Sequence, residues 1–121
     1  MPAYGTVATY LPPGVPIYMF NGESPSAPAA SIAVTRVQAG TFPGTLGAVT
    51  FQLSFAASPT ASVEIQGSMV DSTAAWAIAP TLHTTTTQND SYTDTGAWLF
   101  YRIYVASESG GYPLSVIVAR I

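Results

Sequence analysis

The clearest pattern in the chain is an alternation of apolar and polar residues between positions 49 and 68. Residues 49–55 read Val-Thr-Phe-Gln-Leu-Ser-Phe, which is the period expected of a strand with one buried face. A second alternating run at 62–68 follows the turn sequence Ala-Ser-Pro-Thr at 57–60. Two such runs joined by a short polar turn predict an antiparallel hairpin.

Further strands are predicted at both ends of this region. Residues 32–38 (Ile-Ala-Val-Thr-Arg-Val-Gln) and 114–121 (Leu-Ser-Val-Ile-Val-Ala-Arg-Ile) have the apolar, β-branched character of strands. Residues 98–107 are apolar or aromatic at both alternating sets of positions, so this strand should be covered on both faces or meet another subunit.

The remaining segments are weaker in pattern. Residues 76–82 predict a strand that Pro80 interrupts. Residues 40–47 predict a turn-rich connection, and residues 84–95 predict a polar loop at one end of a sheet. No window shows helical periodicity, so we expect less than about 10% helix. Seven or eight strands packed as a two-sheet antiparallel β-sandwich over residues 31–121 fit this length.

Residues 1–30 predict an extended, proline-rich N-terminal arm that is nevertheless apolar. Six prolines in this stretch exclude a helix and most central-strand pairing. Two interpretations remain open: the arm completes the sheet of its own domain, or it lies across a neighbouring subunit. Its large apolar side chains would supply the contact in either case: Tyr4, Tyr10, Ile17, Tyr18 and Phe20.

Charge is scarce along the whole chain. Only 7% of the 121 residues are charged, there is no lysine, and the formal net charge is −3, whereas an ordinary soluble domain has about 25% charged residues. A surface without charges is typical of a subunit covered by partners. The lack of clustered Lys and Arg argues against nucleic acid as a partner. No stretch has the roughly 18 apolar residues of a membrane span, and residues 1–20 have no targeting signal.

Catalytic and cofactor chemistry is poorly represented. There is no cysteine, and His83 is the single histidine, so we expect no catalytic triad, no metal centre, no cofactor and no enzymatic activity. Asp71, Asp90 and Asp94 could contribute to a loop calcium site, but they lack Asp-x-Asp-x-Asp spacing. Residues 89–91 match the N-glycosylation pattern Asn-x-Ser.

One group of motifs carries a resemblance. Residues 63–68 (Val-Glu-Ile-Gln-Gly-Ser) are expected to lead into a turn at Gly67, which Asp71 caps, and Trp76 then begins the next strand and covers the core. Residues 100–105 (Phe-Tyr-Arg-Ile-Tyr-Val) add a strand with one central arginine. Over residues 49–121 this combination resembles the capsid decoration (cement) proteins of tailed bacteriophages.

The resemblance implies a jelly-roll sandwich that forms homotrimers on the virion surface and binds the major capsid protein. The alternative is a receptor- or carbohydrate-binding module of a phage tail, with Trp76, Trp98, Tyr92, Asp90 and Asn89 available for a sugar site. Arg102 should be paired, with a carboxylate such as Glu64 or with carbonyls of a neighbouring chain. The predicted partner-binding residues are Tyr4, Tyr10, Ile17, Tyr18, Phe20, Trp98, Phe100 and Arg102.

Overall fold

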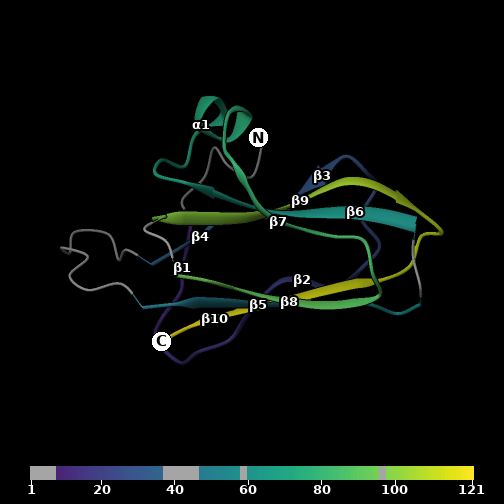
Figure 1. Ribbon diagram of the computed structural model, residues 1–121, viewed down its shortest axis with the longest axis horizontal. Coiled ribbons are helices and arrows are strands. Elements are labelled where there is room, and N and C mark those ends of the chain that lie inside the picture. Colours follow the sequence, from purple (N-terminus) through teal and green to yellow (C-terminus); the bar gives the residue numbers. More distant parts are fainter. Residues whose placement is uncertain (1–7, 37–46, 58–59, 96–97) are drawn as a thin grey trace.

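The protein is a β-sandwich of two sheets packed face to face (Figure 1). The structure is a computed structural model that describes residues 8–36, 47–57, 60–95 and 98–121. Of these residues, 58% are in strands and 5% in helix, which confirms the predicted all-β class. The elements in chain order are β1 (Thr9–Tyr10), β2 (Ile17–Glu23), β3 (Ala29–Ala30), β4 (Val34–Thr35), β5 (Val49–Phe55), β6 (Thr60–Ser68), α1 (Thr73–Ala77), β7 (Thr81–Thr85), β8 (Asn89–Asp94), β9 (Phe100–Ser109) and β10 (Leu114–Arg120).

The strands divide between the sheets in a nested order. Sheet A has the order β1-β4-β9-β6-β7, with β3 also paired to β9, and sheet B has the order β2-β10-β5-β8. Antiparallel partners are β2 with β10, β4 with β9, β5 with β8, and β6 with β7. The chain can therefore be described as a two-stranded antiparallel ribbon that turns at the β6–β7 connection. Its successive strand pairs lie in alternate sheets: β6–β7 in sheet A, β5–β8 in sheet B, β4–β9 in sheet A and β2–β10 in sheet B.

The alternating residues of β5 pack inward as predicted. Its apolar side chains are at most 2% exposed, whereas Thr50, Gln52 and Ser54 face solvent. From sheet A, Tyr101 reaches across the interior and meets Phe51 edge to face, with 5.6 Å between ring centroids. Complete burial of such side chains contributes about 1.5–3 kcal/mol each. The largest fully buried members of the core are Tyr101, Phe51, Leu11, Ile65, Ile103, Leu114, Val34, Val49, Val63, Val105, Val116 and Val118.

The expected hairpin between residues 49–55 and 62–68 is wrong. Both segments are strands, but β5 pairs with β10 and β8, while β6 pairs with β9 and β7 in the other sheet. A period of two residues shows that each strand has one buried face. In a sandwich the same pattern arises when consecutive strands lie in opposite sheets, so the short turn did not identify the partner.

The region around Trp76 also differs from the prediction. Gly67 and Ser68 belong to β6 and pair with β9, so the expected turn begins later. Trp76 lies in the short helix α1 rather than in a strand, and of the strand predicted at 76–82 only Thr81 and Leu82 are in a strand, as the start of β7. Ser72 caps α1 by accepting a hydrogen bond from the Ala75 amide at 3.1 Å. A helix of five residues is too short to display a 3.6-residue period.

Residues 84–95 were expected to form a loop, but most of them are in strands. The end of β7 and all of β8 lie in this segment, which crosses from sheet A to sheet B. The strand β8 has no apolar alternation because Asp90, Tyr92 and Asp94 are its inward residues. Of the strand predicted at 32–38, the described part contains β4, and the turn-rich segment 40–47 lies outside the described residues except for Gly47.

The N-terminal segment completes the domain's own sheets in the part that is described. The strand β2 is hydrogen-bonded to β10 at the edge of sheet B, and β3 is paired with β9 in sheet A. Phe20, expected to contact a partner, is 7% exposed and belongs to the core. Residues 17–23 therefore complete the sheet of their own domain, which is the first of the two interpretations of the arm.

Gly67 permits a close approach between β6 and the side chain of Trp98. A Cβ atom at this position would lie 2.7 Å from Trp98 Cγ and 3.0 Å from Leu82 Cδ1. Both partners pack against the core, so they have little room to move away. The absence of a side chain at residue 67 allows Trp98 to cover this end of β6.

We expect the substitution Gly67→Ala to lower the free energy of unfolding by about 1–3 kcal/mol, because the added methyl group overpacks the site. Urea unfolding followed by tryptophan fluorescence measures the change. Ser62→Ala, at a half-buried position of the same strand, is the control and should stay within about 0.5 kcal/mol of wild type. Equal stability of Gly67→Ala and wild type would contradict the packing argument.

Candidate functional site

Uncharged side chains predominate on the outer face of sheet B, whose exposed charged residue is Glu23 at the end of β2. The other outward side chains, exposed or half-buried, come from all four strands and are hydroxyl, amide or apolar groups. The Thr50 and Thr93 hydroxyls are hydrogen-bonded to each other at 3.0 Å, and the Ser54 hydroxyl donates to Asn89 Oδ1 at 3.0 Å. We call this surface the neutral face: Tyr18, Asn21, Thr50, Gln52, Ser54, Asn89, Ser91, Thr93, Ser115, Ile117 and Ala119.

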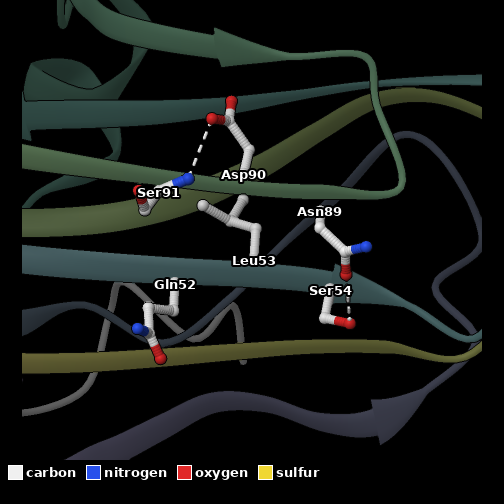
Figure 2. A pocket seen from close by; sticks show the side chains of 6 residues that line it. All are labelled: Gln52, Leu53, Ser54, Asn89, Asp90 and Ser91. Atoms are coloured by element: carbon white, nitrogen blue, oxygen red, sulfur yellow. Dashed lines mark hydrogen bonds between the residues drawn. The ribbon is translucent and has the colours of Figure 1, made fainter.

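A shallow polar hollow of about 520 Å³ lies on the β5–β8 side of the neutral face. Figure 2 shows its lining residues, with Asn89 directed toward Ser54 and Gln52 beside them. Backbone pairing places Gln52 opposite Ser91 and Ser54 opposite Asn89. Besides Leu53 and Asp90, whose side chains point to the other side of the sheet, the hollow presents amide and hydroxyl groups that can donate and accept hydrogen bonds.

Asp90 points to the other side of β8 and connects the two sheets (Figure 2). Its Oδ2 atom lies 2.7 Å from His83 Nε2 and accepts a hydrogen bond from the Thr85 hydroxyl at 2.7 Å. The His83 ring stacks on Tyr92 with 4.8 Å between centroids. Hydrogen bonds from His83 and Thr85 hold the pKa of Asp90 below its ordinary value of 3.8. This cluster joins β7 to β8, which are the edge strands on this side of the sandwich.

A second polar link between the sheets lies deeper. Asp94 is 6% exposed and accepts hydrogen bonds from the hydroxyls of Tyr101, at 2.5 Å, and Tyr92, at 3.2 Å. Burial and the nearby Asp94 carboxylate raise the pKa of both tyrosines. The Arg36 guanidinium lies 5.4 Å from the Tyr101 ring centroid. Asp94 is thus satisfied inside the sandwich and is not available to an external ligand.

The three arginines make contacts within the chain. Arg36 is 3% exposed and donates to the carbonyls of Gly47 and Trp98. Arg120 donates to the Leu11 carbonyl and to the Tyr10 hydroxyl. Both guanidinium groups are therefore used to hold segments of their own chain together.

Arg102 is buried under the β6–β7 connection. It donates from Nε to Gln66 Oε1 at 2.7 Å, and its guanidinium lies over the rings of Trp76 and Tyr104, at 4.9 and 5.4 Å from their centroids. Glu64, the carboxylate suggested as its partner, instead accepts a hydrogen bond from Thr81. Trp76 therefore covers the outer face of sheet A, not the interior core for which it was predicted.

Asp71 holds Trp76 in this position. Its Oδ1 atom accepts a hydrogen bond from the indole Nε1 at 2.8 Å, so Asp71 orients the ring while Ser72 caps the helix. The sequence analysis expected Asp71 to cap a turn and Trp76 to begin a strand over the core, and it did not predict the hydrogen bond between them. Sequence reasoning missed the neutral face as a continuous surface, although the alternation at 49–55 contained its central residues.

The predicted partner-binding residues do not form one surface. Tyr4 lies outside the described residues. Tyr18 is 51% exposed on the neutral face, whereas Tyr10, Ile17, Trp98 and Phe100 are half-buried, and Phe20 and Arg102 are buried. Tyr18 is thus the described member of this group that is free to meet another molecule on the neutral face.

The residues considered for a sugar site are also separated. Asn89, Asp90 and Tyr92 are on β8, while Trp76 lies over sheet A and Trp98 contacts Gly67. Tyr92 packs against the core and His83, so no aromatic ring of these five lies flat beside the polar hollow.

No group of three or more His, Cys, Asp or Glu residues that could hold a metal ion occurs in the described ranges. Within the same ranges, no helix is long and apolar enough to cross a membrane. Comparison with known proteins finds no matching family model, curated protein or solved structure.

We expect Asp90→Asn to lower the free energy of unfolding at neutral pH by about 0.5–1.5 kcal/mol, because it weakens hydrogen bonds made to a charged group. Since the pKa of Asp90 is lowered in the folded state, its contribution is present above the unfolded value of 3.8 and is lost as the pH falls through the folded value. The gap between wild type and variant should therefore close in acid.

Urea unfolding at a series of pH values measures this gap. Glu23→Gln removes the same charge from the exposed end of β2 and is the control, with an expected change within about 0.5 kcal/mol. A gap that stays constant down to about pH 2, where free carboxyl groups are protonated, would exclude the charged hydrogen bonds as its origin.

Proposed function

We propose that the chain is a structural virion protein, a decoration (cement) subunit that binds the major capsid protein of a phage head and stabilises it without enzymatic activity. The observation that carries the proposal is the neutral face. All nine charged residues lie in the described part of the chain, and none is a member of the neutral face; Glu23 is exposed beside Asn21 at the end of β2. An extended sheet surface of this kind is suited to contact with another protein.

The energetic reason is desolvation. Removing an ionised side chain from water costs far more than removing a hydroxyl or amide that regains a hydrogen bond. The neutral face offers such groups in regular rows, with Tyr18 and Ile117 as apolar contacts beside them. Protein interfaces are depleted in charged residues at their centres. The face therefore meets the requirement for burial against a capsid surface.

The nested strand pairing supports the jelly-roll part of the proposal. When the strands from β2 to β10 are numbered along the chain, counting β3 and β4 as one, there are eight segments. The first pairs with the eighth, the second with the seventh, the third with the sixth, and the fourth with the fifth, while β1 adds to the edge of sheet A beside β4. A ribbon wound in this way into two sheets is the arrangement of a jelly roll, an architecture found in capsid and lectin domains. Because fold alone does not specify function, the neutral face remains the stronger argument.

We propose further that the subunit forms homo-oligomers, as trimers, on the particle surface. The small number of charges favours this state, since a free monomer usually relies on charged residues for solubility.

A receptor- or carbohydrate-binding function is the second candidate, and the polar hollow favours it. Gln52, Asn89 and Ser91 offer the amide and hydroxyl groups that recognise sugar hydroxyls. Binding of the purified chain to a glycan array, lost in Asn89→Ala, together with location of the chain on the tail and not on the head of purified virions, would support this function over decoration.

The decoration proposal is tested first by mass spectrometry of virions made by the genome that encodes the chain, where the chain should be present. The purified protein should then rebind virions from which it has been stripped. We expect the double variant Thr50→Lys/Gln52→Lys to bind at least tenfold more weakly, because the interface would bury two unpaired ammonium groups.

Thr84→Lys is the matched control, since Thr84 is an exposed strand residue of sheet A, outside the neutral face. It should bind stripped virions like wild type. Binding of the double variant that equals wild type would show that the neutral face is not the site of attachment, and absence of the chain from virions would reject the decoration function.

A further inference from the structure

The connection between β6 and β7 is held rigidly against sheet A. Ser72 caps α1, Asp71 accepts the hydrogen bond from Trp76, and Trp76 is 2% exposed over Arg102. The Ser68 hydroxyl adds contacts to the Val70 backbone, donating to the carbonyl and accepting from the amide. The side chains that this connection displays are therefore fixed in place before any partner arrives.

The displayed side chains are apolar. Met69, Val70 and Ile78 are 50%, 56% and 85% exposed, respectively. They border a hollow of about 260 Å³ whose walls are formed largely by Ala75, Ala79, Pro80 and Trp98. Clustered apolar exposure on a rigid segment is typical of a protein-interaction site. We call this surface the α1 patch: Gly67, Ser68, Met69, Val70, Ala75, Ile78, Ala79, Pro80 and Trp98.

The α1 patch combines a projection and a recess of matching chemistry. Ile78 is the most exposed large apolar side chain of the described residues and stands on the rim of an apolar hollow. A surface that carries both features next to each other is complementary to a second copy of itself, because each copy can place its isoleucine in the hollow of the next.

Charge is also compatible with self-contact. Two copies of the same surface bring like charges together, so a charged patch would repel its own copy. None of the residues of the α1 patch is charged, and the neighbouring Asp71 carboxylate is bound to Trp76. An oppositely charged partner would find no group here to recognise.

We propose that the α1 patch is the contact between copies of this chain, with Ile78 of one copy inserted into the apolar hollow of its neighbour. This proposal rests on the proposed homo-oligomer. It places the contact between copies on a surface separate from the neutral face. The α1 patch lies on the outer side of sheet A, and the neutral face lies on the outer side of sheet B (Figure 1).

Sedimentation equilibrium of the full chain tests the contact with Ile78→Glu. We expect self-association at least tenfold weaker than wild type, because the carboxylate would be buried in an apolar hollow. Ile32→Glu adds the same charge at another exposed isoleucine, 42% exposed and outside the patch, and should associate like wild type. Thermal unfolding of both variants checks that the fold is kept.

Ala75→Leu provides a second variant that adds no charge. Ala75 lines the hollow and leucine is a good helix former, so this substitution should fill the recess, retain the fold and weaken association. A monomeric wild-type chain, or association unchanged in both Ile78→Glu and Ala75→Leu, would overturn the proposal.

Rebinding to stripped virions separates this proposal from the decoration function. Weaker association of Ile78→Glu with retained virion binding supports an α1 contact between copies. Loss of virion binding with intact self-association would assign the patch to the capsid protein and overturn the contact between copies, while leaving decoration in place.

Discussion

Tyr101 is the residue on which the relation between the two sheets depends. Its ring meets Phe51 of sheet B edge to face, and its hydroxyl donates to Asp94 of β8. Apolar packing alone would hold the sheets at a given separation without selecting one alignment. The buried hydrogen bond selects it, because displacement of β8 along β9 would separate the buried Asp94 carboxylate from the Tyr101 hydroxyl and leave it with Tyr92 alone. The positions of β7 and β8, and with them the His83–Asp90 link, follow from this alignment.

The same use of polar groups explains the unusual surface. Asp94 and Arg36 are buried, Arg102 is covered by Trp76, and Arg120 is bound to Tyr10 and to the backbone near it. A chain with few charges thus directs most of them to contacts that align its own elements. Most side chains that remain on the outer face of sheet B are hydroxyl, amide or apolar groups, which cost less to desolvate than charges and are well suited to burial in an interface.

The sequence predicted the all-β class and the strands with a regular apolar face, such as β5 and β10, because period and burial are directly related. It did not predict that β5 and β6 lie in different sheets, since both arrangements give the same alternation. It missed β8 because the inward residues Asp90 and Asp94 are polar. Their hydrogen-bond partners lie on β7 and β9 of sheet A. It placed Trp76 in the core because hydrophobicity does not distinguish an interior ring from one that covers an arginine on the outer face.

The nested pairing also accounts for the separation of the two proposed surfaces. The neutral face requires four strands with a continuous outer side, which sheet B provides because its connections leave at the strand ends. The α1 patch requires a connection that folds back over a sheet, and the β6–β7 connection does so over sheet A, held by Asp71, Trp76 and Arg102. Since the interior of the sandwich lies between them (Figure 1), one subunit can bind a particle through sheet B while it contacts another copy through α1.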